Sequence, residues 1–367
     1  MFLSAKTNRQ HFYLDLKNQS YDIKIGCDII DLSNVEKFVS NKEVLIVFDS
    51  AINGSRIMQF KEMISKFTLK LELIKIDATE KNKSQETLSK IHSVLVENKF
   101  SRDCLVIGMG GGIVCDIAGF SAATYQRGVN FLLIPTTLLA QVDASVGGKT
   151  AINHPKGKNM IGAFHQPVGV IADTSFLQTL PEREISCGLS EMIKHGLIND
   201  INYFCWLEEN IEQILRLEPK SIEEAIGKSI EIKTFYVKED EKEANTRALL
   251  NFGHTFGHAI ELIGEFKDYN HGEAVAIGMI LALELSARIG NISKQDCLRV
   301  RDLMDKAKID TKIKNPINPT DLYKGMMGDK KKKGDILNLV VLEGLGKAKV
   351  TSAIDKSLIL EILNSSL

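Results

Sequence analysis

The stretch Cys104-Leu-Val-Ile-Gly108-Met-Gly110-Gly-Gly112-Ile-Val-Cys-Asp116 joins a short apolar run to a cluster of glycines. The apolar run predicts a strand. The glycines would let the backbone approach a ligand closely, and the helix expected next offers free N–H groups. A strict G-x-G-x-x-G motif fails, because its sixth position is Ile113 or Cys115. A bare glycine-rich turn stays open as an alternative, but the strand–glycine–helix context favours a nucleotide site.

Further apolar runs surround this stretch and alternate with helical or loop segments. Strands are expected at residues 44–48, 71–76, 131–134 and 168–172, and a helix at 84–98. Several of these strands are apolar on both faces, as in a parallel sheet covered by helices. An N-terminal hairpin is expected from residues 11–16 and 21–25. The alternation predicts a doubly wound, Rossmann-like α/β domain over residues 1–178, with its ligands at the carboxyl ends of the strands.

The pattern after residue 178 is mainly helical and predicts a second domain over residues 179–367. The clearest helical segments are 211–217, 222–237, 272–289 and 294–307, followed by a strand-like run at 336–342 and a final helix at 356–363. A chain of 367 residues is long for a single core, which also favours two domains.

The composition excludes several classes of protein. Lys plus Arg (46) nearly cancels Asp plus Glu (47), which argues against a generally basic nucleic-acid binder. No uncharged stretch reaches the roughly 18–20 residues of a membrane span, and we expect no secretory signal at the N-terminus. Six cysteines without a C-x-x-C pair are typical of a reduced, cytoplasmic protein.

The most specific pattern is Asn251-Phe-Gly-His254-Thr-Phe-Gly-His258-Ala-Ile-Glu261, followed by His271-Gly-Glu273. Two histidines four residues apart lie on one face of a helix. A carboxylate-bearing helix, Glu191-Met-Ile-Lys194-His195, lies earlier in the chain. A catalytic zinc typically takes three His or Glu ligands and leaves one position open, which His254, His271 and one Glu would satisfy. Single histidines are usually structural, but three within 18 residues favour a metal site.

Two other motifs are weaker. Val142-Asp-Ala-Ser-Val-Gly-Gly148-Lys149-Thr150 lacks the first glycine of a phosphate-binding P-loop, so a solvated loop competes with a ligand contact through Lys149. The run Asp329-Lys-Lys-Lys-Lys333 is usually a solvated turn, although it could lend one lysine to a phosphate pocket.

Taken in order, these motifs resemble those of 3-dehydroquinate synthases, over roughly residues 44–342. The matching stretches also include Tyr125-Gln-Arg127-Gly128, Pro135-Thr-Thr137-Leu138, Lys158-Asn159-Met-Ile-Gly-Ala-Phe164 and Leu180-Pro-Glu-Arg183. The resemblance implies an N-terminal NAD-binding α/β domain and a helical C-terminal metal-binding domain. Two local departures are Thr79, where the family usually has glycine, and Cys115, where a smaller residue is common.

The resemblance implies conversion of 3-deoxy-D-arabino-heptulosonate 7-phosphate to 3-dehydroquinate and phosphate. This is the second step of the shikimate pathway to chorismate and the aromatic amino acids, and it is a carbon–oxygen lyase reaction. NAD transiently oxidises the C5 alcohol, which acidifies the C6 proton and permits loss of phosphate. Reduction, ring opening and an aldol cyclisation follow. The alternatives are another sugar-phosphate cyclase, a metal-dependent polyol dehydrogenase that releases NADH, or a binding module without activity.

The resemblance also implies roles for individual residues. The metal, Zn²⁺ or Co²⁺, would be bound by Glu191, His254 and His271. Catalytic roles would fall to His258, Lys194 and Glu261. Substrate would contact Arg127, Asp143, Lys149, Lys158, Asn159, Lys194, Lys233, Arg247, Asn251, Lys330 and Lys331. NAD would contact Asp49, Glu80, Lys83, Gly110, Gly111, Gly112, Asp116, Thr136, Thr137, Asp143, Lys149, Lys158, Phe176, Leu177 and Thr179. The active unit would be a homodimer in which Arg127 reaches the substrate phosphate of the neighbouring subunit.

Overall fold

The computed structural model describes residues 9–264, 268–328 and 337–366 and divides into two compact units. Unit 1 comprises Met1–Leu180 and Pro219–Thr234, and unit 2 comprises Pro181–Glu218 and Phe235–Leu367. The segment Pro219–Thr234 is expected in the second domain from the sequence, but it clusters with unit 1. Within unit 1, Gly227 of this segment lies against the side chain of Gln10 in the N-terminal hairpin, and Lys233 forms an ion pair with Asp143.

Unit 1 is built on a seven-stranded sheet with the order β1-β2-β9-β6-β5-β3-β4. Its strands are β1 (Gln10–Leu14), β2 (Tyr21–Gly26), β3 (Glu43–Asp49), β4 (Lys70–Ile76), β5 (Leu105–Gly110), β6 (Asn130–Pro135) and β9 (Gly169–Asp173). Strand β1 pairs antiparallel with β2, and all other neighbours are parallel. The carboxyl ends of the six parallel strands therefore lie at one edge of the sheet.

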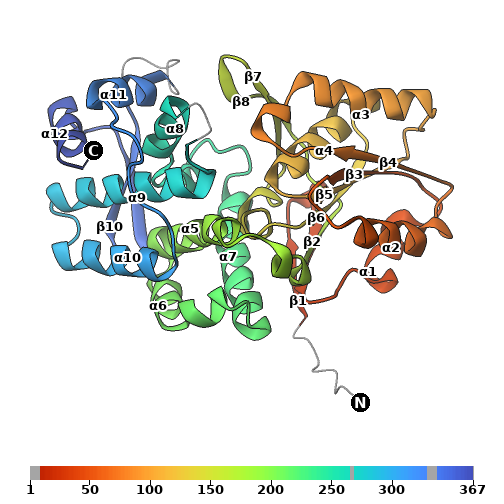
Figure 1. Ribbon diagram of the computed structural model, residues 1–367, viewed down its shortest axis with the longest axis horizontal. Coiled ribbons are helices and arrows are strands. Elements are labelled where there is room, and N and C mark those ends of the chain that lie inside the picture. Colours follow the sequence, from red (N-terminus) through yellow and green to blue (C-terminus); the bar gives the residue numbers. More distant parts are fainter. Residues whose placement is uncertain (1–8, 265–267, 329–336, 367) are drawn as a thin grey trace. The chain divides into compact units, whose positions relative to one another are not determined.

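Helices cover both faces of this sheet (Figure 1). On one face, α1 (Leu32–Val39) and α2 (Gly54–Ser65) pack on alternate residues of β3 and β5, such as Ile46 and Ile107. On the other face lie α3 (Gln85–Glu97) and α4 (Gly112–Thr124). The expected doubly wound α/β fold is confirmed.

One element of unit 1 differs from the sequence-based expectation. Where the sequence indicates a loop, either solvated or in contact with a ligand, the structure has a separate antiparallel hairpin of β7 (Lys149–His154) and β8 (Gly157–Phe164). Most side chains of β8 are exposed, so its sequence lacks the buried alternation by which a strand is recognised.

Unit 2 is helical, as expected, and is centred on α9 (His271–Arg288). This helix is apolar on all sides and almost every residue from Gly272 to Ser286 is buried, which is typical of a central core helix. It is surrounded by α5 (Glu182–Asn199), α8 (His254–Ile263), α10 (Lys294–Lys306), α12 (Lys356–Ser366) and strand β10 (Leu339–Gly344). The other elements are α6 (Ile201–Leu215), α11 (Pro319–Gly328), β11 (Lys347–Thr351), which pairs with β10, and the end of α7 (Pro219–Glu239).

Among the residues that the structure describes, none of the helices combines the length and the apolar character that a membrane span requires.

Candidate active site

Three helices of unit 2 bring the expected metal ligands together. Glu191 lies in α5, while His254 and His271 are the first residues of α8 and α9. Helices α8 and α9 run antiparallel and cross closely at two glycines. A Cβ atom at Gly278 would lie 2.1 Å from the carbonyl oxygen of Gly253, so only glycine permits this approach. This crossing holds the start of α9 beside the histidine-bearing face of α8.

The ligand atoms are spaced as for one shared ion. The Nε2 atoms of His254 and His271 lie 3.6 and 3.9 Å from Oε1 of Glu191. Ligand atoms bound at about 2 Å to one tetrahedral ion would lie roughly 3.3 Å apart, so a small contraction suffices. The residues of this group each offer one ligand atom, and these atoms all lie within 4.8 Å of one another.

The electrostatics of this group suit a divalent cation. The Glu191 side chain is fully buried and forms an ion pair with the ammonium of Lys194 through Oε2, and no other group of the described residues donates a hydrogen bond to either carboxylate oxygen. Burial, together with the positive charge of Lys194 and the neighbouring histidines, holds the pKa of His254 well below its usual range. A neutral imidazole is the form that binds a metal. A buried carboxylate and a neutral imidazole therefore make a fitting donor set.

The outer nitrogens of both imidazoles have partners that orient the rings. Nδ1 of His254 lies 3.2 Å from the carbonyl oxygen of Phe252, and Nδ1 of His271 lies 3.3 Å from Oε1 of Glu261. Metal-binding histidines in proteins are usually held in this way, with the second nitrogen bonded to a carbonyl or carboxylate. Glu261, for which the resemblance implies a catalytic role, is thus placed to orient His271.

His258 lies one turn after His254 on the same face of α8. Its ring centroid is 5.4 Å from that of His254 and 6.2 Å from that of His271. His258, Glu261 and His271 form a second group whose donor atoms lie within 4.8 Å of one another. The geometry therefore brings all three predicted histidines together, and their division into ligand and proton carrier remains a proposal.

Unit 2 also holds two buried cations close in sequence to this cluster. Lys194 and Arg247 are each 1% exposed, and a buried charge is costly unless it has a purpose or a partner. Arg247 lies in a short helix, Thr246–Asn251, and donates to the carbonyl oxygen of Glu241. Asp240 accepts N–H bonds from Ala244, Asn245 and Arg247 and so shapes this segment. Sequence reasoning missed Asp240, whose only local signal is an acid at the end of a predicted helix.

The expected NAD contacts of unit 1 lie at the carboxyl edge of the sheet. Asp49 ends β3, Gly110 ends β5, and Thr136 follows β6. Phe176, Leu177 and Thr179 lie in the short helix after β9, and Thr137 lies against Gly111. Burial raises the pKa of Asp49. No side chain of the described residues caps the start of α4, so its first N–H groups are available to an anion such as a diphosphate.

A second polar cluster of unit 1 joins the helices to the β7–β8 hairpin. Lys83 bonds to both Asp116 on α4 and Asn159 on β8. Lys158, also on β8, lies 3.6 Å from Glu80. These five residues, which the resemblance implicates in binding NAD or substrate, therefore form two groups that neighbouring residues of β8 connect.

The remaining predicted residues are placed as follows. Asp143 forms an ion pair with the buried Lys233 of α7, and both belong to unit 1. Lys149 begins β7, and Asn251 donates to the carboxylate of Glu243. Lys330 and Lys331 lie outside the described residues.

Comparison with known proteins decides the family. Residues 73–187 match the N-terminal model of 3-dehydroquinate synthase, and residues 188–332 match its C-terminal model. A 3-dehydroquinate synthase from Teredinibacter turnerae is 44% identical over 95% of this chain and 97% of its own. The chain belongs to the 3-dehydroquinate synthase family. A second member, from Aliivibrio fischeri, is 40% identical over 96% of this chain and 98% of its own.

Solved structures of sugar-phosphate cyclases share the fold of this 3-dehydroquinate synthase family member closely. A 2-deoxy-scyllo-inosose synthase, complexed with carbaglucose-6-phosphate, NAD⁺ and Co²⁺, has a TM-score of 0.88 at 26% identity, covering 98% of this chain and 100% of its own. A 2-epi-5-epi-valiolone synthase from Streptomyces hygroscopicus, with NAD⁺ and Zn²⁺ bound, has the same TM-score and identity, covering 96% and 98%. Glycerol dehydrogenase from Schizosaccharomyces pombe shares the fold alone, at 14% identity and a TM-score of 0.63.

Proposed function

We propose that this enzyme converts 3-deoxy-D-arabino-heptulosonate 7-phosphate to 3-dehydroquinate with release of phosphate, and is therefore a carbon–oxygen lyase. The observation that carries the proposal is the buried carboxylate of Glu191. Its Oε1 faces the Nε2 atoms of His254 and His271, its Oε2 pairs with the ammonium of Lys194, and no other group among the described residues donates a hydrogen bond to it. A buried carboxylate oxygen that faces two imidazoles suits a bound cation, and the adjacent lysine suits an anionic substrate.

In this proposal Glu191, His254 and His271 hold Zn²⁺ or Co²⁺, and the carboxyl edge of the unit 1 sheet holds NAD. When bound, the ion would polarise the substrate alcohol and NAD would accept its hydride. The neighbours bound to NAD⁺ and Co²⁺ or Zn²⁺ support both assignments. The uncapped start of α4 after Gly110 supports the cofactor site.

The cations of the chain bind the two anionic ends of the substrate. A phosphate and a carboxylate together carry about three negative charges near neutral pH, and buried Lys and Arg side chains match them as donors. The proposed substrate contacts are Arg127, Asp143, Lys149, Lys158, Asn159, Lys194, Lys233, Arg247, Asn251 and a lysine of the Asp329–Lys333 run.

His258 carries protons at the substrate hydroxyl. An imidazole can both accept and donate a proton near neutral pH, which an alcohol oxidation followed by a reduction requires. Glu261 holds the ring of His271 through Nδ1. The leaving phosphate can remove the neighbouring proton itself, so the chain needs no further carboxylate base at that carbon.

The test is to incubate the metal-loaded enzyme with the heptulosonate phosphate and NAD, and to follow phosphate and dehydroquinate together. We expect equal amounts of both products and no net NADH, because the hydride returns to the substrate in each turnover. Net NADH without phosphate release would instead indicate a polyol dehydrogenase. Turnover of sedoheptulose 7-phosphate in place of the heptulosonate would indicate another cyclase.

We also infer a homodimer whose two sites each use Arg127 of the partner. Arg127 is exposed and sits in a turn of three consecutive residues with positive φ, namely Gln126 (49°), Arg127 (69°) and Gly128 (120°). None of the carboxylates that the structure describes pairs with it. A strained, unpaired arginine at the surface is suited to a phosphate outside its own subunit.

We place the reaction in the cytoplasm. All six cysteines are free thiols in the structure, which fits a reducing compartment.

A further inference from the structure

We propose that Arg183 and Glu273 are positioning residues of the metal centre. Their ion pair sets the spacing between the helix that carries Glu191 and the helix start that carries His271. The inference rests on the metal-dependent function proposed above.

Two ligand-bearing helices meet along three successive contacts. Arg183, Cys187 and Glu191 follow one another at four-residue intervals on α5, so they share one face. The first turn of α9 presents Glu273, Gly272 and His271 to that face in the opposite order. The third contact is the pair of metal ligands, with Nε2 of His271 3.9 Å from Oε1 of Glu191.

The first contact is a two-point ion pair. Nε and Nη2 of Arg183 donate to Oε1 and Oε2 of Glu273 at 2.6 and 2.7 Å. A guanidinium bound at two points fixes orientation as well as distance. Glu273 lies only two residues beyond His271, in the same helical turn. The ion pair therefore also fixes the position of the metal ligand His271.

At the middle contact, the backbones of the two helices touch directly. The N–H of Gly272 donates to Sγ of Cys187 at 3.1 Å. A Cβ atom at Gly272 would lie 2.4 Å from Cα of Cys187, so the two backbones touch at this point. A change in the outer pair therefore tilts the start of α9 about this point and moves His271.

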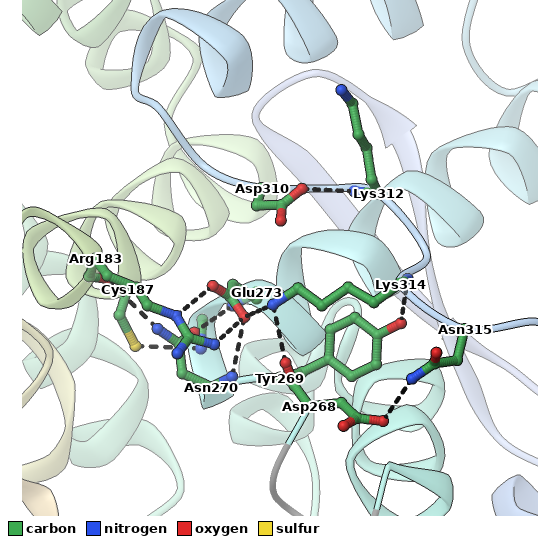
Figure 2. A network of polar contacts seen from close by, with 11 residues as sticks. Arg183, Cys187, Asp268, Tyr269, Asn270, Glu273, Asp310, Lys312, Lys314 and Asn315 are labelled. Carbon is green, nitrogen blue, oxygen red and sulfur yellow. Dashed lines mark hydrogen bonds and ion pairs between the residues drawn. The ribbon is translucent and has the colours of Figure 1, made fainter.

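Glu273 is itself held by several donors, as Figure 2 shows. The N–H of Asn270 donates to its Oε2 at 3.1 Å, which completes the capping box of α9. Nζ of Lys314 donates to the same oxygen at 3.0 Å and to the carbonyl oxygen of Asp268 at 2.8 Å. The backbone N–H of Lys314 donates to Oη of Tyr269 at 2.7 Å. The carboxylate is thus fixed from the helix start, from α5 and from the loop before α11.

The same unit offers a matched control. Arg299 of α10 makes a similar two-point pair with Glu208 of α6, through Nε at 3.1 Å and Nη2 at 2.5 Å. Neither helix carries a proposed metal ligand. Loss of this pair should lower stability without changing the metal centre.

The experiment compares Arg183→Met, Arg183→Lys, Glu273→Gln and the control Arg299→Met. Each full-length protein is stripped with a chelator, and the dissociation constant for Co²⁺ is measured by competition together with the visible spectrum of the bound ion. We expect Arg183→Met and Glu273→Gln to bind Co²⁺ about 10–100-fold more weakly and with a changed spectrum. Arg183→Lys should recover part of the affinity, while Arg299→Met should match wild type in both readouts. Urea unfolding of all four variants measures the stability change separately.

The proposal is overturned if Arg183→Met binds Co²⁺ within twofold of Arg299→Met and shows the wild-type spectrum. Arg183 is 53% exposed, so its variant should fold even if Glu273→Gln does not. The binding assay contains no substrate. A wild-type protein that binds Co²⁺ but makes no dehydroquinate would therefore refute the proposed reaction and leave this inference standing.

Discussion

Replacing Lys194 by Met should destabilise the metal-free protein and strengthen metal binding at the same time. Lys194 and Glu191 lie one helical turn apart and form an ion pair with side chains that are 1% and 0% exposed. Removing one partner of a buried pair leaves the other charge uncompensated, at a cost of about 3–5 kcal/mol. We therefore expect Lys194→Met to lower the free energy of unfolding of the metal-free protein by about this amount near neutral pH.

The effect on metal binding has the opposite sign. The ammonium of Lys194 repels any cation bound to Glu191, and a unit charge about 5 Å from a divalent ion interacts with it by roughly 6–7 kcal/mol at an effective dielectric constant near 20. Structural relaxation reduces this value, so we expect a gain in zinc affinity of at least about tenfold, or ~1.4 kcal/mol. Loss of the ammonium also raises the pKa of His254, which it helps to lower, so the measurement belongs at about pH 8, where protons compete little.

The assay is urea unfolding with and without zinc, together with zinc competition against a chromophoric chelator. Zinc at 100 times its dissociation constant should restore about 2.7 kcal/mol of stability to the variant. Arg299→Met serves as the control that loses an ion pair without a change in zinc affinity. A metal-free variant within about 1 kcal/mol of wild type, or a zinc affinity no higher than that of wild type, would refute the assignment of Lys194 as the charge that balances Glu191.

Three further predictions concern separate parts of the site. His258→Ala should keep its zinc and lose about 10²–10⁴-fold in kcat, whereas loss of zinc in a metal analysis would make His258 a ligand. Burial tends to raise the pKa of Asp240, but the three backbone N–H bonds that its carboxylate accepts hold this pKa below the usual value. The carboxylate therefore stabilises the folded state above about pH 4, and this contribution is lost as pH falls. Asp240→Asn should therefore cost about 1–3 kcal/mol in urea unfolding at pH 7, and a cost unchanged at pH 3 would contradict this. Mixed dimers of Arg127→Ala and Lys194→Ala should recover about one quarter of wild-type activity, because half of the dimers are mixed and half of their sites are intact; no recovery despite proven subunit exchange would place Arg127 in its own subunit's site.

The elements that the sequence predicts well are those buried on both sides. Strand β5 and helix α9 are continuous apolar runs, and such runs have few alternative placements in a folded chain. The sequence indicates a loop, solvated or in contact with a ligand, where the structure has the β7–β8 hairpin, which lies outside the main sheet. Met160 is 70% exposed there and Phe164 45%, so no buried face imposes the two-residue alternation that identifies a strand.

In the candidate site, likewise, the sequence predicts features set by local helical spacing but not those set by contacts between distant residues. The interval of four residues between His254 and His258 already places both imidazoles on one helical face, because that interval is a property of the helix itself. Which nitrogen faces Glu191 depends on contacts made by the other nitrogen, with Phe252 in one case and Glu261 in the other. The alignment of α5 with α9 depends on residues 90 positions apart, Arg183 and Glu273, whose pairing leaves no periodic trace in the sequence. Local spacing in the sequence can therefore identify candidate ligands. The distances between these ligands are set by the packing of helices, which the sequence pattern does not show.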